Sequence, residues 1–513
     1  MKRLNLVLIG TVLLSSSVFA GGLVTNVNGG AVWARTLSRD ASTDIDAVYF
    51  NPAGLGQLKK GLHISLSNQT IFQTRQITSD YMFLDGAPKT YEAELKAPFF
   101  PSIYAAYKME KLAISAGFNI IGGGGSANFQ EGLPSFEIPV ASVVPQLNAI
   151  LDTVDNTVNA LMGQNPGFST VEAYNMVASF EGSSNYMGFQ VGATYAINDM
   201  ISVAVGGRFV HAKNTYNGSL SGVTINPPAT TSPIFGTDPM TPGNYLTGVG
   251  GYISGAVAGT PYENLPQVQT LLDTLAFFSG VFNDNTADQE LSTVQTGFGF
   301  TPIVGINLSL LDMVNIGIKY EHHTKIELEN ETTSDVIVNG QGMFPDGEKT
   351  RADLPGMVSA GVQVKPIEKL SASVGFNYFL DKTAYYGVTD ENGAQVNNES
   401  TINDNAYTFS GSVEYKFLGI LGASVGFSTG NLGVNNIYQS DMSYALKSTS
   451  IGGGVFVELG KIVTLNAGYV HVMYDDYSNS ELSYPLSPEM IVPYNDTYGK
   501  KTSIIAIGLD ISL

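Results

Sequence analysis

Short and long connections alternate along the chain without a break after residue 58, between segments of alternating hydrophobicity. The short turns lie near Met109-Glu110, Asn198-Asp199, Leu311-Asp312, Ile367-Glu368, Leu418-Gly419 and Gly460-Lys461. The long connections span residues 78–98, 130–181, 221–290, 331–350, 388–404, 430–444 and 476–500. Six short turns and seven long connections join fourteen strands, with both chain ends on the short-turn side. This asymmetry is typical of bacterial outer-membrane barrels and predicts an all-β, 14-stranded antiparallel transmembrane β-barrel.

The strands themselves are indicated by alternation with a period of two residues. At the C-terminus, Ile505, Ile507 and Leu509 share one face, and Ala506 and Gly508 lie on the other. The same pattern recurs over residues 313–320 and 201–208. An apolar face opposite small or polar residues suits lipid outside and a polar or ligand-bearing lumen inside. A soluble sandwich has the same period with its faces exchanged, so the connection lengths decide between the two folds.

The N-terminus has the pattern of a secretory signal peptide over residues 1–20. Lys2 and Arg3 form its charged end, Leu4–Leu14 its mostly apolar core, and Val18-Phe19-Ala20 a small-residue cleavage site. That core is too short for the roughly 20 apolar residues of a spanning helix. We therefore expect an exported protein in the outer membrane of a Gram-negative bacterium.

Composition agrees with a membrane barrel and excludes several other classes. Charged residues make up 14% of the chain, below the roughly 25% of ordinary soluble domains. Cysteine is absent, which excludes disulfides and thiolate chemistry. The net charge of −20 argues against nucleic acid, because phosphates require a basic surface.

Residues 21–58 are too irregular for a strand, and we interpret them as a plug inside the barrel. Eight strands enclose only side chains and sixteen leave an aqueous channel, so fourteen strands would leak unless something fills the lumen. The segment contains the only tryptophan, Trp33, and ends in the turn Asn51-Pro52-Ala53-Gly54. A free periplasmic tail is the alternative interpretation. The predicted domains are then a signal peptide (1–20), a plug (21–58) and a barrel (59–513).

Two long connections, near residues 140–178 and 262–283, have apolar residues at helical spacing. The second stripe includes Leu272, Leu275 and Phe278. Such apolar faces must be covered by something. The two helices either cover each other as a lid or form an apolar vestibule for a ligand above the barrel mouth, and both interpretations stay open.

Four successive glycines, Gly122, Gly123, Gly124 and Gly125, fall at the upper end of the third strand. Glycine inside a strand weakens pairing and marks a bulge, a bend or a close backbone approach. One interpretation is that the strand ends there. The other is a kink that opens a lateral hole in the wall.

Few basic residues are predicted to face the lumen. Strand parity places Arg208 and Lys319 there, and His211 follows near the outer end of the same strand as Arg208. Such a cation could bind a ligand carboxylate. Internal pairing, for example of Lys319 with Glu321, is the more common arrangement.

We find no sequence signal for catalysis, for a metal site or for a cofactor. The five histidines fall mostly on separate predicted strands, and His322-His323 would direct its rings to opposite faces. No Gly-x-Ser-x-Gly elbow is present. We expect a protein that is not an enzyme.

The exported start, the plug and the barrel together resemble the FadL/TodX family of outer-membrane transporters for long-chain fatty acids and other hydrophobic compounds. The segments that carry the resemblance are Asp40-Ala41-Ser42, the run Asp46 to Leu55 with its Asn51-Pro52-Ala53-Gly54 hatch motif, and Asp353-Leu354-Pro355. The resemblance implies a 14-stranded barrel with a hatch, ligand capture at extracellular loops and an inner hydrophobic site. It also implies sideways exit at a kink in the third strand, the position of Gly122–Gly125.

We therefore expect passive uptake of hydrophobic molecules, most of all long-chain fatty acids, by a monomer in contact with outer-membrane lipid and lipopolysaccharide. Uptake of aromatic hydrocarbons or a porphyrin-like ligand on the same scaffold is one alternative. A surface adhesin or structural barrel is another. The apolar loop helices and the tetraglycine favour transport over adhesion.

Overall fold

A computed structural model describes residues 22–311, 313–338, 341–390, 393–487 and 489–513. The predicted signal peptide, residues 1–20, lies outside the described residues.

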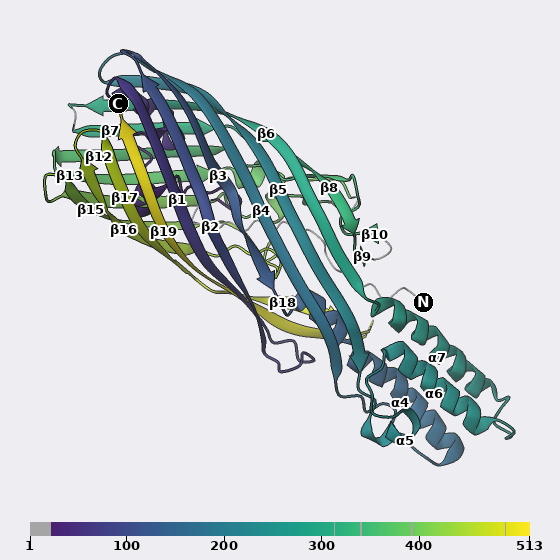
Figure 1. Cartoon of the computed structure of the whole chain (residues 1–513). Helices are drawn as coiled ribbons and strands as arrows, with labels where there is room; N and C mark the ends of the chain where they lie inside the picture. Colours follow the sequence, from purple (N-terminus) through teal and green to yellow (C-terminus); the bar gives the residue numbers. More distant parts are fainter. Residues whose placement is uncertain (1–21, 312, 339–340, 391–392, 488) are drawn as a thin grey trace.

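A single closed antiparallel sheet forms the wall of the molecule (Figure 1). Its strands are β1 (Gly61–Ser79), β2 (Lys89–Lys108), β3 (Leu112–Phe129), β4 (Tyr174–Ala196), β5 (Ile201–Ile225), β6 (Gln289–Leu310), β7 (Val314–Glu321), β8 (Glu327–Ser334), β11 (Lys349–Arg351), β12 (Met357–Ile367), β13 (Leu370–Phe379), β14 (Tyr407–Lys416), β15 (Leu421–Asn431), β16 (Ser448–Leu459), β17 (Val463–Tyr474), β18 (Tyr477–Pro485) and β19 (Ile491–Ser512). Pairing of β1 with β19 closes the barrel.

Three wall positions are each filled by two consecutive strand segments. β6 pairs with both β7 and β8, and β19 pairs with both β17 and β18. β7 and β8 pair in turn with β12 and β11. The seventeen strands of the sheet therefore occupy fourteen wall positions, which confirms the predicted 14-stranded antiparallel barrel. A separate two-stranded ribbon, β9 (Ile337–Val338) with β10 (Gln341–Gly342), lies outside the wall.

The predicted short turns that the structure describes lie at one end of the barrel, here the short-turn end, and the long connections lie at the other, the loop end (Figure 1). The strands extend further toward the loop end than the sequence suggests. The predicted loop over residues 476–500 is mostly strand, because β18 and β19 continue as a hairpin to residues 485 and 491.

The outer face of the wall is apolar, as the period-two pattern predicts. In β19 the outward Ile505 and Ile507 are 51% and 63% exposed, whereas the inward Ile504 and Ala506 are buried. Covering such side chains contributes about 1.5–3 kcal/mol each. The exposed apolar belt is therefore of the kind that faces lipid hydrocarbon.

Helices and 3-10 turns occur in two places, inside the barrel and in the loops. Inside are α1 (Ala31–Thr36), α2 (Ala47–Phe50) and η1 (Pro52–Gln57). In the loops are α3 (Pro134–Ala141), α4 (Val143–Met162), η2 (Ala229–Thr231), α5 (Ser232–Phe235), α6 (Pro242–Val257), α7 (Pro266–Asn285), η3 (Asp381–Thr383) and η4 (Asn398–Ser400). Among the described residues, no helix has the length and apolar character needed to cross a bilayer.

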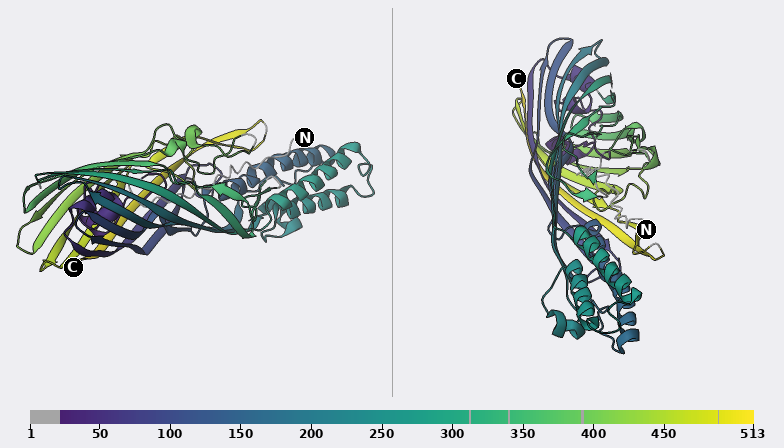
Figure 2. Two further views of the ribbon diagram at one scale, coloured as in Figure 1. Left: turned by 90° about the horizontal axis from the view of Figure 1, so that it is seen from above. Right: turned by 90° about the vertical axis from the view of Figure 1, so that its right-hand side faces the viewer.

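The loop helices α4, α6 and α7 project beyond the loop end as a bundle (Figures 1 and 2). The sequence predicted two helices there and missed α6. Its apolar residues recur at helical spacing (Tyr245, Leu246, Val249, Ile253 and Val257) and are all buried. Four glycines between them hide this pattern, because glycine is unfavourable in helices.

Candidate functional site

The N-terminal segment, residues 22–58, lies inside the barrel, where it appears in purple in Figure 2. Helix α1 contacts β14 to β17, β19 and β1, while η1 contacts β2 to β6. Nearly every residue from 22 to 55 is buried. The segment therefore crosses the lumen and packs against the inner wall on opposite sides.

The turn at Asn51 fixes the lower part of this segment to the wall. The Asn51 side chain accepts from the Ala53 amide at 3.2 Å and donates to the Ile306 carbonyl of β6 at 3.0 Å. Pro52 opens η1, where its missing N–H costs nothing. Thr194 and Ser202 donate to the carbonyls of Pro52 and Ala53 at 2.6 and 2.7 Å.

Glycines provide the close approach that this anchoring needs. A Cβ on Gly54 would collide with the Ser42 carbonyl oxygen. On the wall, Gly317, Gly361 and Gly375 are register partners in β7, β12 and β13, and a Cβ on any of them would collide with Asp40. The wall thus has a trough of glycine backbone that accommodates residue 40. Because these glycines are far apart in sequence, only knowledge of the register could have found this trough.

A buried charge cluster joins the segment to the wall just above this trough. Glu321 accepts from Arg208 at 2.6 and 2.9 Å and from Lys319 at 2.6 Å. The two cations also flank the ring of Tyr49 at 5.1 and 5.2 Å. Lys319 donates to the Tyr49 carbonyl at 3.1 Å, and the Arg208 guanidinium also donates to Gln190.

Both predicted lumen cations therefore bind Glu321 and contact the N-terminal segment. The alternative expectation, internal pairing of Lys319 with Glu321, is what the structure contains. The third basic candidate, His211, does not share their face. It stacks on Phe298 at 4.8 Å on the outer surface of β5 and β6, between the buried Val210 and Ala212.

The tetraglycine lies within β3 and disturbs its pairing on both sides. Pairing of β3 with β4 shifts register between Ile120 and Gly122 and again between Gly123 and Gly125. Gly123 (φ +64°) and Gly124 (φ +118°) adopt conformations that side chains disfavour. The strand continues to Phe129, so the interpretation that it ends at the glycines is wrong.

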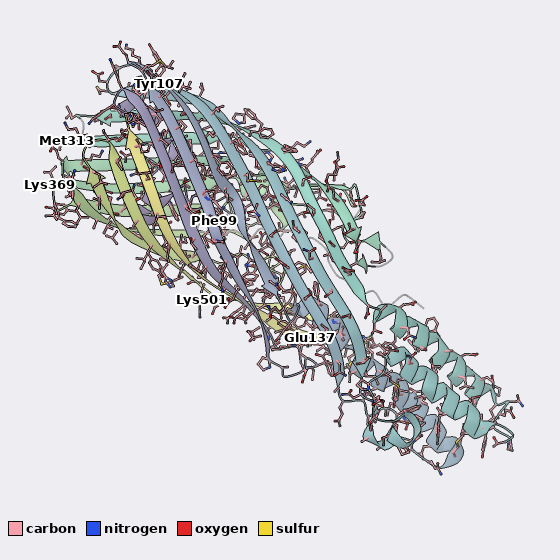
Figure 3. The ribbon with its side chains drawn as sticks, viewed as in Figure 1. Phe99, Tyr107, Glu137, Met313, Lys369 and Lys501 are labelled. Atoms are coloured by element: carbon pink, nitrogen blue, oxygen red, sulfur yellow. The ribbon has the colours of Figure 1, made fainter. Side chains whose placement is uncertain are left out.

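Pairing between β2 and β3 is interrupted at the same level. The register runs from Ser102↔Asn119 directly to Glu94↔Asn128, so residues 95–101 and 120–127 do not pair with each other. Phe99 lies in this stretch, is 80% exposed and is labelled in Figure 3. The wall therefore has a local break in its backbone hydrogen bonds between β2 and β3.

Side chains fill this break from inside. The Phe100 ring lies against Gly124, and Leu95 lies against Gly125. The N-terminal segment is bound to the same place, because the Asn26 amide donates to the Ile121 carbonyl and its side chain to the Gly123 carbonyl, both at 2.8 Å. Movement of residues 24–26 would therefore remove part of what covers the break.

A partly open apolar pocket lies at the loop end, with about 960 Å³ of empty space when the adjoining open solvent is included. Its walls come from α3, from the outer ends of β4, β5 and β6, and from the end of α7. The apolar lining residues are Phe136, Pro139, Val140, Val143, Phe180, Leu220, Phe282, Leu291, Val336, Met343, Phe344, Met442 and Tyr484. None of the described residues that line it has a charged side chain. Glu137, beside Phe136, instead pairs with Lys89 at 2.7 Å.

The loop helices pack mainly on one another. Leu275 is buried, and Leu272 and Phe278 are partly buried, in a cluster formed by α4, α6 and α7. Because each buried apolar side chain contributes about 1.5–3 kcal/mol, this cluster is a core in its own right. The end of α7, at Phe282 and Asn285, reaches the pocket, and so does the start of α4, at Val143 and Gln146. Leu272, Leu275 and Phe278 do not line it.

Sequence reasoning missed two parts of this site. The β2 side of the break contains Pro98-Phe99-Phe100-Pro101, and prolines inside a strand are a signal for interrupted pairing. The pocket residues Met343 and Phe344 lie in a loop with no periodic pattern. Among the described residues, no group of three or more His, Asp or Glu side chains is arranged to hold a metal ion.

Comparison with known proteins gives matches in structure only. No protein-family model matches the sequence, and no curated protein matches it. A Pseudomonas aeruginosa FadL homologue matches with a TM-score of 0.58 at 10% identity, covering 96% of this chain and all of that one. The P. putida toluene transporter TodX matches with a TM-score of 0.50 at 12% identity, covering 91% and 94%. The chain thus has the FadL/TodX-type barrel fold.

Proposed function

We propose that this protein carries hydrophobic molecules passively across the outer membrane of a Gram-negative bacterium. The observation that carries the proposal is the combination of an apolar pocket at the loop end with a break in the wall between β2 and β3. The exposed apolar belt supports a membrane location, with the loop end outside and the short-turn end toward the periplasm. The structural neighbours are a FadL homologue and a toluene transporter.

In this mechanism a ligand leaves the outer leaflet or the medium and enters the apolar pocket. It then moves along the lumen above the N-terminal segment, which acts as the plug. Phe100 and Leu95 shift from the break, and the ligand passes sideways into bilayer hydrocarbon. Exposing a CH₂ group to water costs about 0.8 kcal/mol, so about fourteen methylenes would cost about 11 kcal/mol on an aqueous route. Lateral release avoids that cost.

Long-chain fatty acids are the ligand class that we favour. Arg208 and Lys319 do not support this choice, because Glu321 already neutralises them. The uncharged pocket suits an alkyl chain. It equally suits a neutral hydrocarbon, which is the second candidate. An adhesin or structural barrel would have no use for the wall break.

Filling the pocket tests the proposal. Leu220→Trp places a large side chain in the pocket from the wall of β5, and the expected result is at least a fivefold loss of radiolabelled palmitate and hexadecanol uptake by intact cells. Leu418→Trp, in an exposed turn at the short-turn end, is the matched control and should leave uptake unchanged. Equal uptake by both variants and the wild type would contradict the role of the pocket.

A further inference from the structure

Two buried cations, Arg75 and Lys500, lie side by side on the inner wall where the barrel closes. They are register partners in β1 and β19 and are 2% and 7% exposed. Four other buried cations of the described chain have carboxylate partners: Arg35 with Glu414, Arg39 with Asp46, and Arg208 and Lys319 with Glu321. Lys108, which is also buried, instead donates to the Glu110 backbone carbonyl at 3.1 Å. Within the described ranges, neither Arg75 nor Lys500 has a carboxylate partner.

Arg75 is also short of hydrogen-bond acceptors. A guanidinium has five N–H donors. The Arg75 Nε donates to Gln73 at 3.2 Å, whereas Nη2 is buried and has no acceptor among the described residues. The nearest inward carboxylate on β19, Asp496, is four residues from Lys500, a separation of about 13 Å along a strand. It is too far away to pair.

Aromatic rings are the main neighbours of both cations. Tyr444 lies 5.6 Å from Arg75 and 5.6 Å from Lys500, and Tyr474 lies 5.3 Å from Lys500. A cation–π contact contributes about 0.5–2 kcal/mol, whereas removing one ion from water costs several kcal/mol. The rings therefore do not compensate two adjacent like charges. An anion bound between Arg75 and Lys500 would compensate both charges.

The surroundings of the pair specify which kind of anion fits. A guanidinium binds the two oxygens of a carboxylate through parallel hydrogen bonds, and the lysine ammonium can add a third. The tyrosine rings and the apolar core around them suit an alkyl chain attached to that carboxylate. Met442 lines the apolar pocket and Tyr444 covers the cations. Two residues span at most about 7 Å, so the two sites adjoin.

We propose that Arg75 and Lys500 bind the carboxylate of an amphipathic acid, such as a long-chain fatty acid, whose alkyl chain extends toward the apolar pocket. This inference rests on the proposed function and deepens it, because it separates fatty acids from neutral hydrocarbons as ligands. It also moves the carboxylate site away from Arg208 and Lys319.

The test measures binding of palmitate and of hexadecanol, its uncharged counterpart, to full-length protein in nanodiscs of zwitterionic lipid. The variants are Arg75→Gln and Lys500→Met. Each should weaken palmitate binding at least tenfold and hexadecanol binding less than threefold. Lys501→Met is the matched control, because Lys501 is the next residue of β19 and faces outward (Figure 3). It should change neither affinity.

Folding is checked independently of binding. Removing an uncompensated buried charge should not destabilise the barrel, so both variants should keep the heat-resistant gel migration of a folded barrel. Palmitate should raise the melting temperature of the wild type and not that of the variants. If one variant fails to fold, the other carries the test.

Other outcomes overturn the inference or the proposed function separately. Equal losses for palmitate and hexadecanol, or no loss for palmitate, would contradict the carboxylate site while leaving hydrophobic uptake intact. Anomalous scattering can locate bromide between the two cations. Bromide that stays bound there at saturating palmitate would identify an inorganic anion site instead. Wild-type protein that binds neither ligand would contradict the proposed function itself.

Discussion

Replacing Glu321 by glutamine should release residues 22–58, the proposed plug, because this one carboxylate neutralises two buried cations. Its oxygens accept three hydrogen bonds of 2.6–2.9 Å from Arg208 and Lys319. Glu321→Gln keeps the size of the side chain and leaves both positive charges buried. Breaking a buried ion pair from one side costs about 3–5 kcal/mol. That is a large part of the 5–15 kcal/mol by which folded domains are stable.

The cost should fall on the plug, since both cations contact Tyr49 and Lys319 binds its carbonyl. At about 1.4 kcal/mol per factor of ten, 3 kcal/mol shifts the equilibrium between bound and released plug by about 100-fold. The only tryptophan, Trp33, lies in the plug and is 4% exposed. Its fluorescence therefore reports plug release separately from unfolding of the barrel.

The assay is urea titration of the protein in lipid vesicles, with Trp33 emission followed for the plug and circular dichroism for the barrel. Glu321→Gln should lower the urea midpoint of the Trp33 transition more than that of the barrel. Glu321→Gln combined with Lys319→Met should recover part of the loss, because it leaves only Arg208 uncompensated. An unchanged Trp33 midpoint in Glu321→Gln would refute the role of this cluster.

Three further predictions follow from the plug and the loops. Gly54→Ala should loosen the plug by about 1–3 kcal/mol, because the added Cβ meets a backbone carbonyl; Gly419→Ala, in open space, is the control, and equal Trp33 midpoints would contradict the prediction. Deleting residues 22–58 should let small sugars enter vesicles in a swelling assay, and an equally tight barrel would show that the segment is not a plug. Burial raises the pKa of Asp381, in η3, to about 6, against hydrogen bonds that lower it. The folded state then binds this proton more tightly, so stability should fall as the pH rises from about 4 to 6, and Asp381→Asn should flatten that fall.

The wall of the barrel could be predicted from sequence because two local signals repeat in every strand. Period-two alternation gives the strands, and turn length gives the end at which each connection lies. Neither signal depends on contacts between distant residues. Helix α6 was missed for the opposite reason, since its glycines conceal an apolar face that becomes evident only when α7 packs on it.

The site could be predicted only in part, since strand parity gives the face of a residue and not its partner. Parity placed Arg208 and Lys319 inside correctly, but the plug contact at Tyr49 depends on the three-dimensional path of residues 22–58. The break in the wall can be predicted only when the pairing of both β2 and β3 is known. The tetraglycine of β3 was visible, whereas its counterpart in β2 lay partly within the predicted loop 78–98.

The most direct test of lateral release is uptake through a repaired wall. Replacing Gly122–Gly125 by Thr-Val-Thr-Val should restore side chains and pairing in β3, and intact cells should then bind radiolabelled palmitate at their surface as before. Uptake should fall at least tenfold relative to the wild type, while the outer membrane stays closed to sugars. Uptake at the wild-type rate by a folded variant would contradict exit between β2 and β3.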